Sequence, residues 1–326
     1  MKRIIFKAIC FSVLIVILQV TLYFLRGGDR RFFNTHLHMY AGDLPRSLDI
    51  VFFGDSANGS FNANDKNKKP ISMMFYDLCR GPSMLHRYAP AYHMDMFYYL
   101  AKYFIDAGVK IKVVVIPINL RSFSPAWDKN PGYQFPVEKF IITHNHFFYR
   151  VFYKPLAVFQ AFRLVPVTEA EFNDTPVRNG ARSVGTVSYF EDKERYRAVT
   201  DEKLREKLIY HYMYELTPEH AKLAAMLRLA RLLKGNNIIP FFYITPIDHE
   251  FGAEYMGKEF SGRISENVAL IRQLLEPERV RFLDLSRSLP HPVFDWEEDR
   301  YPNEHLMEKG KIFVARELAR EICRPD

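Results

Sequence analysis

The stretch Leu48-Asp49-Ile50-Val51-Phe52-Phe53-Gly54-Asp55-Ser56 decides the fold of this chain of 326 residues. Its apolar run has the length and character of a strand that is buried on both faces, and Gly54 with Asp55 predicts a turn directly after it. Similar apolar runs recur along the chain, and each predicts a further strand: 71–78, 111–118, 238–244 and 280–285.

Segments with apolar residues at helical spacing lie between most of these runs. Helices are expected at about 94–107, 217–235, 262–275 and 306–322. The second of them is expected to begin with Thr217 as its cap and Pro218 in its first turn. Strands that alternate with helices predict an α/β fold, a three-layer sandwich in which helices cover both faces of a central parallel sheet.

The region from 124 to 235 departs from this alternation, because aromatic helical pieces and a polar stretch separate two predicted strands. We interpret it as a helical insertion at about 124–235 within a domain that spans 32–326. Residues 1–31 form a separate N-terminal segment with its flank. The polar residues 27–47 predict a linker between the two parts.

The N-terminal segment is apolar from Ile4 to Leu25, with Lys7 as its single charge. Roughly 18 near-apolar residues follow Lys7, which is enough to cross a bilayer. The run ends without a small-x-small cleavage site, so we expect an uncleaved transmembrane signal anchor. Basic residues flank the segment almost equally. The free amino terminus and Asp29 favour a globular domain outside the cytoplasm, periplasmic or otherwise extracytoplasmic.

The composition of the chain indicates which classes of partner to expect and the state of its cysteines. The formal net charge is +7, but basic residues alternate with acidic ones and form no stripe, so no nucleic acid is expected as a partner. Aromatic residues make up 15% of the chain, which favours a Phe-rich core over a broad apolar binding surface. There are three cysteines, of which Cys79 and Cys323 are the one pair available in the body. We expect both to be free thiols.

Residues suited to acyl chemistry follow the predicted strands. Functional groups gather on the loops that leave the carboxyl ends of parallel strands. Ser56 follows the first strand, Gly81 the second, and Asn119 the third. His305 stands directly before the last predicted helix, where it is able to deprotonate a serine. Each residue is weak evidence alone, and the ordered set is the signal.

Gly-Asp-Ser near the start, then Gly, then Asn, then a late His resembles the SGNH (GDSL-type) serine hydrolase superfamily, whose four blocks run in this order. The resemblance covers roughly 48–123 and 236–322. It implies a flavodoxin-like sheet, Ser56 as nucleophile and His305 as general base. It further implies an oxyanion hole built from Ser56, Gly81 and Asn119.

One departure from the family pattern concerns the acid that supports the histidine. The family usually places an aspartate three residues before the histidine, where it orients the imidazole. Here that position is Pro302. The candidates for this role are Asp299, Asp295 and Glu304, and a Ser-His dyad that relies on a backbone carbonyl is the remaining option.

Further polar residues near the predicted strand ends are candidates for substrate contact: Asp55, Arg121 and His249. Arg121 is equally suited to pairing with a buried acid. His249, together with Asp248, is a second candidate for the base. His144 and His146 have the spacing of a metal pair but no companion ligands, so we expect no metal and no cofactor.

These residues predict a serine-dependent acyl-ester hydrolase or O-acyltransferase. An anchored domain of this kind resembles proteins that add or remove acetyl groups on bacterial surface polysaccharides, as in alginate and teichoic-acid modification. The expected substrate is therefore a cell-envelope polysaccharide or glycolipid. The alternatives are a catalytically silent partner of a multi-spanning membrane acyltransferase and a lipid esterase.

Overall fold

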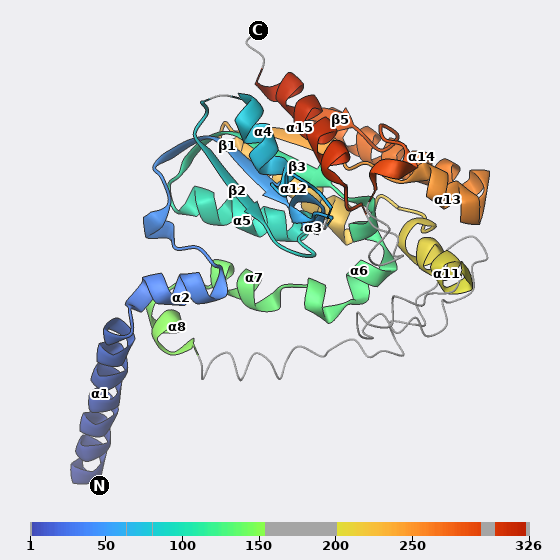
Figure 1. The fold of residues 1–326 in the computed structure, drawn as a ribbon. Coiled ribbons are helices and arrows are strands. Elements are labelled where there is room, and N and C mark those ends of the chain that lie inside the picture. The colour runs from blue at the N-terminus through green and yellow to red at the C-terminus, as the bar shows by residue number, and fades with distance from the viewer. Residues whose placement is uncertain (1, 63, 80, 154–200, 295–303, 324–326) are drawn as a thin grey trace.

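The computed structural model describes residues 2–62, 64–79, 81–153, 201–294 and 304–323 (Figure 1). At its centre is a five-stranded sheet in the order β2-β1-β3-β4-β5, and every neighbouring pair is parallel. The predicted α/β fold with a central parallel sheet is therefore confirmed. The strands are β1 (Ser47–Gly54), β2 (Met84–Tyr88), β3 (Lys110–Ile118), β4 (Ile239–Ile244) and β5 (Arg281–Asp284).

The strand predicted at 71–78 is wrong. These residues form helix α4 (Ile71–Cys79), and the second strand is β2, which lies later in the chain. An apolar run of eight residues fits a short buried helix as well as a strand, because its periodicity does not distinguish the two. Strand β2 lies at the edge of the sheet and is only partly buried along its length, so its sequence lacks an apolar run.

Helices cover both faces of the sheet, as Figure 1 shows. Alternate residues of β1 point to opposite faces: Val51 and Phe53 belong to one buried cluster, and Ile50 and Phe52 to the other. The first cluster packs under α5 (Met94–Asp106), α12 (Ala221–Gly235) and α14 (Lys258–Leu275). The second packs under α4 and α15 (Glu308–Ile322). The layers therefore form the expected three-layer sandwich.

The region predicted as an insertion contains several short helices between β3 and β4. Its last helix, α12, begins later than expected: His220, and not Thr217, caps it by accepting a hydrogen bond from the Lys222 N–H. Helix α12 packs on α5 and leads into β4. The other helices of this region are α6 (Pro125–Lys129), α7 (Pro136–Thr143), α8 (Phe147–Val151) and α11 (Asp201–Tyr212). Beyond β4 lies α13 (His249–Met256).

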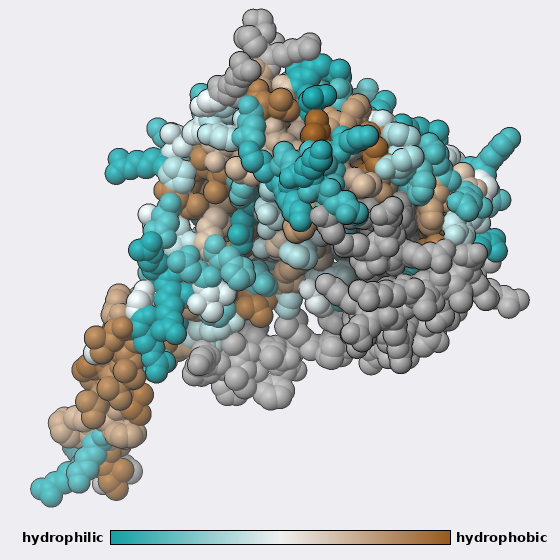
Figure 2. Space-filling model, viewed as in Figure 1, coloured by the Kyte–Doolittle hydropathy of each residue, from teal (hydrophilic) through white to brown (hydrophobic). Residues whose placement is uncertain are grey.

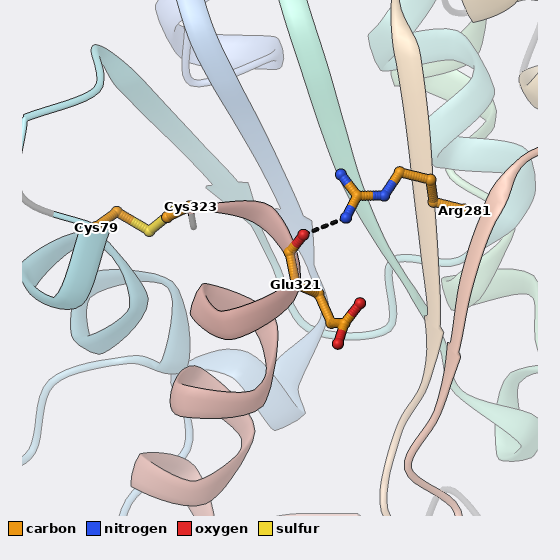
Figure 3. Close-up of a disulfide and its surroundings, with 4 residues drawn as sticks. All are labelled: Cys79, Arg281, Glu321 and Cys323. Carbon is orange, nitrogen blue, oxygen red and sulfur yellow. Dashed lines mark hydrogen bonds between the residues drawn. A yellow bond between two sulfur atoms is a disulfide. The ribbon is translucent and has the colours of Figure 1, made fainter. Parts of the chain in front are cut away.

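A disulfide joins Cys79 at the end of α4 to Cys323 at the end of α15 (Figure 3). The expectation of two free thiols is therefore wrong. Cys79 was expected at a strand end, whereas α4 is a helix that packs beside α15 and brings the two sulfur atoms together. Next to it, Arg281 of β5 donates a hydrogen bond to the carbonyl of Glu321 in α15.

Helix α1 (Lys2–Leu25) projects from the body, and its hydrophobic surface is exposed in Figure 2. It has 24 residues and is long and apolar enough to cross a membrane. The polar stretch predicted as a linker contains helix α2 (Gly28–His36), whose Phe32 and Phe33 are buried against the body. The prediction of a linker is therefore wrong for this part, and the end of α1 is held close to the domain.

Candidate active site

The candidate site lies at the carboxyl edge of the sheet. Strand β2 lies on one side of β1, while β4 lies beyond β3, so the connections change direction between β1 and β3. In open parallel sheets, ligands bind at such a reversal, outside the carboxyl ends of the strands. Here β1 ends at Gly54 and β3 at Ile118, so the loops that carry Ser56 and Asn119 start side by side.

The structure brings Ser56 and His305 together, although 249 positions separate them in the sequence. The Ser56 Oγ lies 3.1 Å from His305 Nε2, and both side chains remain partly exposed. Ser56 opens the short helix α3 (Ser56–Gly59) directly after β1. On the other side, Leu306 is buried and pairs with Phe294, which fixes the chain beside His305. A hydroxyl and an imidazole in this arrangement can exchange a proton.

The pKa of His305 lies well below its ordinary range. Burial, and in second place the positive charge of Arg121, lower the pKa of His305 to about 3. The imidazole is therefore neutral at neutral pH and is able to accept a proton from Ser56 Oγ.

Asp55 supports this turn from beneath. One of its carboxylate oxygens accepts a hydrogen bond from the Ala57 N–H at 2.8 Å, which caps α3. The other accepts from Asn119 Nδ2, also at 2.8 Å. Asp55 is buried, so the structure places it as a brace between the ends of β1 and β3, and not as the substrate contact predicted from the sequence. Asn119 directs its amide to Asp55.

A buried ion pair lies beside His305. Glu304 accepts a hydrogen bond from the Tyr212 hydroxyl at 2.9 Å, and its other oxygen lies 3.5 Å from Arg121 Nε. The guanidinium of Arg121 also packs over the ring of Trp127. Of the two roles predicted for Arg121, the structure therefore shows the pairing with a buried acid. The amide of Asn119 interacts with the Glu304 carboxylate as well, through a side-chain hydrogen bond that lowers the pKa of this acid.

Both carboxyl groups beneath the site are harder to ionise than usual. Burial raises the pKa of Asp55 and of Glu304, and the nearby Arg121 charge opposes that rise in each case. The charge of Arg121 thus lowers the pKa of two buried acids, and after burial it is the second cause that lowers the pKa of His305. The three groups and the imidazole form one coupled electrostatic cluster.

Gly81 does not join this site. It precedes β2, which runs parallel to β1, so it lies at the amino edge of the sheet, whereas Ser56 follows the carboxyl end of β1. The backbone of Gly81 has a positive φ of +126°. The misassigned second strand caused this error. The carboxyl end of β2 instead leads into a turn at Ala91, which adopts φ +63° and accepts a hydrogen bond from Trp127 Nε1. A positive φ at a non-glycine residue gives no signal in the sequence.

The second candidate base, His249, makes other contacts. Its Nδ1 lies 2.8 Å from the Ser261 hydroxyl, and its ring packs on Phe260 of α14. Asp248, which was considered as its partner, lies 2.6 Å from His291 Nδ1. These contacts hold α13 against its neighbours, and the structure does not bring His249 to the Ser56 hydroxyl.

The two histidines of the predicted insertion take separate positions. His146 caps α8 through the Tyr149 N–H, and His144 stacks on Phe140. Among the described residues, no group of three or more His, Cys, Asp or Glu side chains is placed to hold a metal ion.

Asp299 and Asp295, the other candidates for the supporting acid, lie outside the described residues. The sequence also gave no reason to single out Tyr212 or Trp127. Tyr212 reaches Glu304 from α11, and Trp127 packs on Arg121 from α6. Both lie in the region that we predicted to be an insertion, so parts of that region complete the base of the site.

Comparison with known proteins adds the following. No family model and no curated relative matches the sequence. Two solved structures resemble the chain at 10% sequence identity. A proposed acylhydrolase from Bacteroides fragilis has a TM-score of 0.40 and covers 86% of this chain and 91% of its own. A GDSL-like lipase from Bacteroides thetaiotaomicron has a TM-score of 0.39 and covers 90% and 96%. Likenesses of this strength carry no argument about activity, which rests on the geometry of Ser56 and His305.

Proposed function

We propose that this chain is a serine-dependent acyl-ester hydrolase or O-acyltransferase of the SGNH type. The observation that carries the proposal is the 3.1 Å contact between Ser56 Oγ and His305 Nε2 at the carboxyl edge of a parallel sheet. A serine hydroxyl is a poor nucleophile at neutral pH until a base accepts its proton. The neutral imidazole of His305 is within reach to do so.

In the proposed reaction, Ser56 Oγ bonds to the ester carbonyl carbon while its proton passes to His305 Nε2. The Ser56 N–H is the proposed donor to the oxyanion, since the first N–H of a helix has no acceptor within the helix. His305 then returns the proton to the leaving alkoxide, and the acyl group stays on Ser56. Water or a second hydroxyl releases it, with His305 again moving the proton. Asp299 is our proposed support for the imidazolium.

The proposed place of action is the cell envelope, with the domain outside the cytoplasm. Helix α1 is long enough to cross a bilayer, and it packs on the body: Gln19 Nε2 donates to the Val151 carbonyl at 2.8 Å, and Phe24 stacks on Phe147. These contacts favour a retained anchor over a cleaved signal. The disulfide favours an oxidising compartment. We propose an acetyl group as the acyl group and a polysaccharide or glycolipid as its carrier.

A second candidate function is a catalytically silent partner of a membrane acyltransferase. One observation favours it: Gly81 lies at the amino edge of the sheet, away from Ser56, so it does not take the position expected of an oxyanion donor.

A fluorophosphonate probe, which labels activated serines covalently, tests the proposal. We expect the purified full-length protein to be labelled, and Ser56→Ala and His305→Ala to lose labelling by at least about 100-fold. Ser60→Ala and His249→Ala serve as matched controls and should label like the wild type. Absence of labelling in folded wild-type protein supports the silent partner. Labelling that survives in His305→Ala but disappears in His249→Ala assigns the base to His249.

Hydrolysis and transfer are distinguished by the acceptor. Release of p-nitrophenol from p-nitrophenyl acetate reports acylation of Ser56 in both cases. For a hydrolase, the release rate is independent of added oligosaccharide. For a transferase, an oligosaccharide acceptor accelerates release and carries the acetyl group afterwards, which mass spectrometry detects.

A further inference from the structure

A cavity of about 350 Å³ lies where α1 meets the body. The last turns of α1, helix α2 and the segment that starts at α8 form its walls. It lies at the end of the apolar helix, away from the Ser56–His305 pair. Six of its lining residues carry the argument: Leu22, Arg26, Arg31, Phe32, His36 and Tyr153.

The cavity carries a local excess of positive charge. Arg150 also lines it, but Asp29 neutralises this arginine through contacts of 2.7 and 3.1 Å. Arg26 and Arg31 differ: within the part of the chain that the structure describes, no carboxylate lies within ion-pair distance of either. Arg31 Nη1 donates a long hydrogen bond of 3.5 Å to the Arg26 carbonyl. Two guanidinium groups are therefore available to an anionic ligand.

The lining of the cavity also contains a cluster of aromatic rings. The ring of His36 stacks on Phe32 with centroids 4.7 Å apart, and Tyr153 packs edge-on against both. Leu22 extends this apolar lining onto α1, whose surface is exposed along its length. A ligand that fits both the arginines and the apolar lining is amphiphilic, with an anionic head at the arginines and an apolar chain along α1. A small water-soluble anion matches only the arginines.

We propose that this cavity binds the phosphate-bearing headgroup of a membrane lipid, with the lipid chain lying along α1. A guanidinium group can donate two parallel hydrogen bonds to the oxygens of one phosphate, and the opposite charges strengthen both bonds. Basic pockets beside membrane helices suit lipid headgroups, and aromatic rings lie at the same depth. The inference rests on the proposed anchoring by α1. It adds a lipid site that is separate from the candidate active site.

The test uses full-length protein in detergent micelles and native mass spectrometry. The probes are dioleoyl phosphatidylglycerol, dioleoylglycerol, which lacks the phosphate, and inorganic phosphate. We expect retention of phosphatidylglycerol, at least tenfold weaker retention of dioleoylglycerol, and no saturable binding of inorganic phosphate at the same concentration. Arg26→Gln/Arg31→Gln should weaken phosphatidylglycerol binding at least tenfold.

Arg30→Gln/Arg46→Gln is the matched control, because it removes the same charge from two exposed arginines outside the cavity. Arg30 pairs with Asp43 at 3.3 Å. The control should change lipid binding less than twofold. Equal binding by the cavity variant and the wild type, equal loss in both double variants, or equal affinity for inorganic phosphate would each overturn the proposal. Two separate measurements distinguish a failure of this proposal from a failure of the proposed function. Carbonate extraction of cell membranes tests anchoring by α1, and fluorophosphonate labelling tests the active site.

Discussion

At the scale of single residues, the environment of His305 includes the charge of Arg121. Burial, and in second place the charge of Arg121, lower the pKa of His305, and the same charge opposes the rise in pKa that burial causes in Asp55 and Glu304. The side chain of Arg121 is itself buried and stacks on Trp127. A buried cation between acids is the arrangement in which removal of one partner is most damaging, because the others keep their desolvation penalty.

We therefore expect Arg121→Met to lower the free energy of unfolding by about 3–5 kcal/mol. The loss arises because Glu304 and Asp55 stay buried without their cation. Arg121→Met/Glu304→Gln should regain part of the loss, since the double variant no longer buries the Glu304 charge. Urea unfolding of the wild type, Arg121→Met, Glu304→Gln and the double variant measures this coupling. Purely additive losses would contradict the interpretation that Arg121 and Glu304 act as one pair.

At the scale of elements, the disulfide is the feature with the clearest energetic consequence. It connects the ends of α4 and α15, two helices that pack side by side on one face of the sheet, across a sequence separation of 244 residues. Closing a loop of this length restricts the unfolded chain strongly, which in the chain-entropy model is worth about 5 kcal/mol.

Accordingly, Cys79→Ser should lower the free energy of unfolding by about 2–5 kcal/mol. The control is Cys10→Ser, which changes a free and exposed cysteine and should leave the unfolding midpoint unchanged. A reducing agent should destabilise the wild type as much as the substitution does, and should not affect Cys79→Ser further. Equal unfolding curves for oxidised and reduced wild type would exclude a stabilising role for this bond.

Interior strands could be predicted from the sequence, whereas the edge strand could not. Interior strands such as β3 were predictable because burial on both faces requires an uninterrupted apolar run. The edge strand β2 was missed because a partly buried strand needs no such run, and α4 was taken for it. Because α4 was taken for the second strand, Gly81 was predicted at the carboxyl edge of the sheet, whereas it lies at the amino edge.

The same reasoning anticipated the approach of Ser56 and His305, because both were assigned to the carboxyl edge. It did not anticipate that Asn119 would bind Asp55, or that Tyr212 would reach Glu304. Such contacts depend on side-chain directions and on packing between distant helices. The spacing of residues along the chain predicts neither the side-chain directions nor this packing.

At the scale of the whole molecule, burial keeps several histidines neutral. Burial is the main cause that lowers the pKa of His93 and His305 to about 3, that of His249 to about 4, and that of His211 well below its ordinary value. In the unfolded chain the same groups titrate near 6.5. Between about pH 6.5 and 4 the unfolded state therefore binds more protons than the native state. Stability must fall as the pH falls through this window.

The buried carboxyl groups act in the opposite direction. Because burial raises the pKa of Asp55 and Glu304, the native state takes up their protons at a higher pH than the unfolded chain does, which adds stability as the pH falls. One pH unit below 6.5, each fully buried histidine costs about 1.4 kcal/mol. His305 and His249 are only partly buried and contribute less. We expect the histidines to contribute more than the two acids, because the histidines titrate in the unfolded chain near pH 6.5, within the interval considered.

We expect the free energy of unfolding at pH 5.5 to be about 2–4 kcal/mol lower than at pH 7.5, as measured by urea unfolding of full-length protein in detergent. His93→Gln tests the cause. This histidine is buried, and its Nε2 lies 2.7 Å from the Tyr133 carbonyl, where a glutamine amide can also donate. The variant should lose about 1 kcal/mol less than the wild type over the same pH interval, because it carries one fewer group that titrates only in the unfolded state. A wild-type stability that stays level from pH 7.5 to 5.5 would contradict the expectation that the buried histidines dominate the pH dependence.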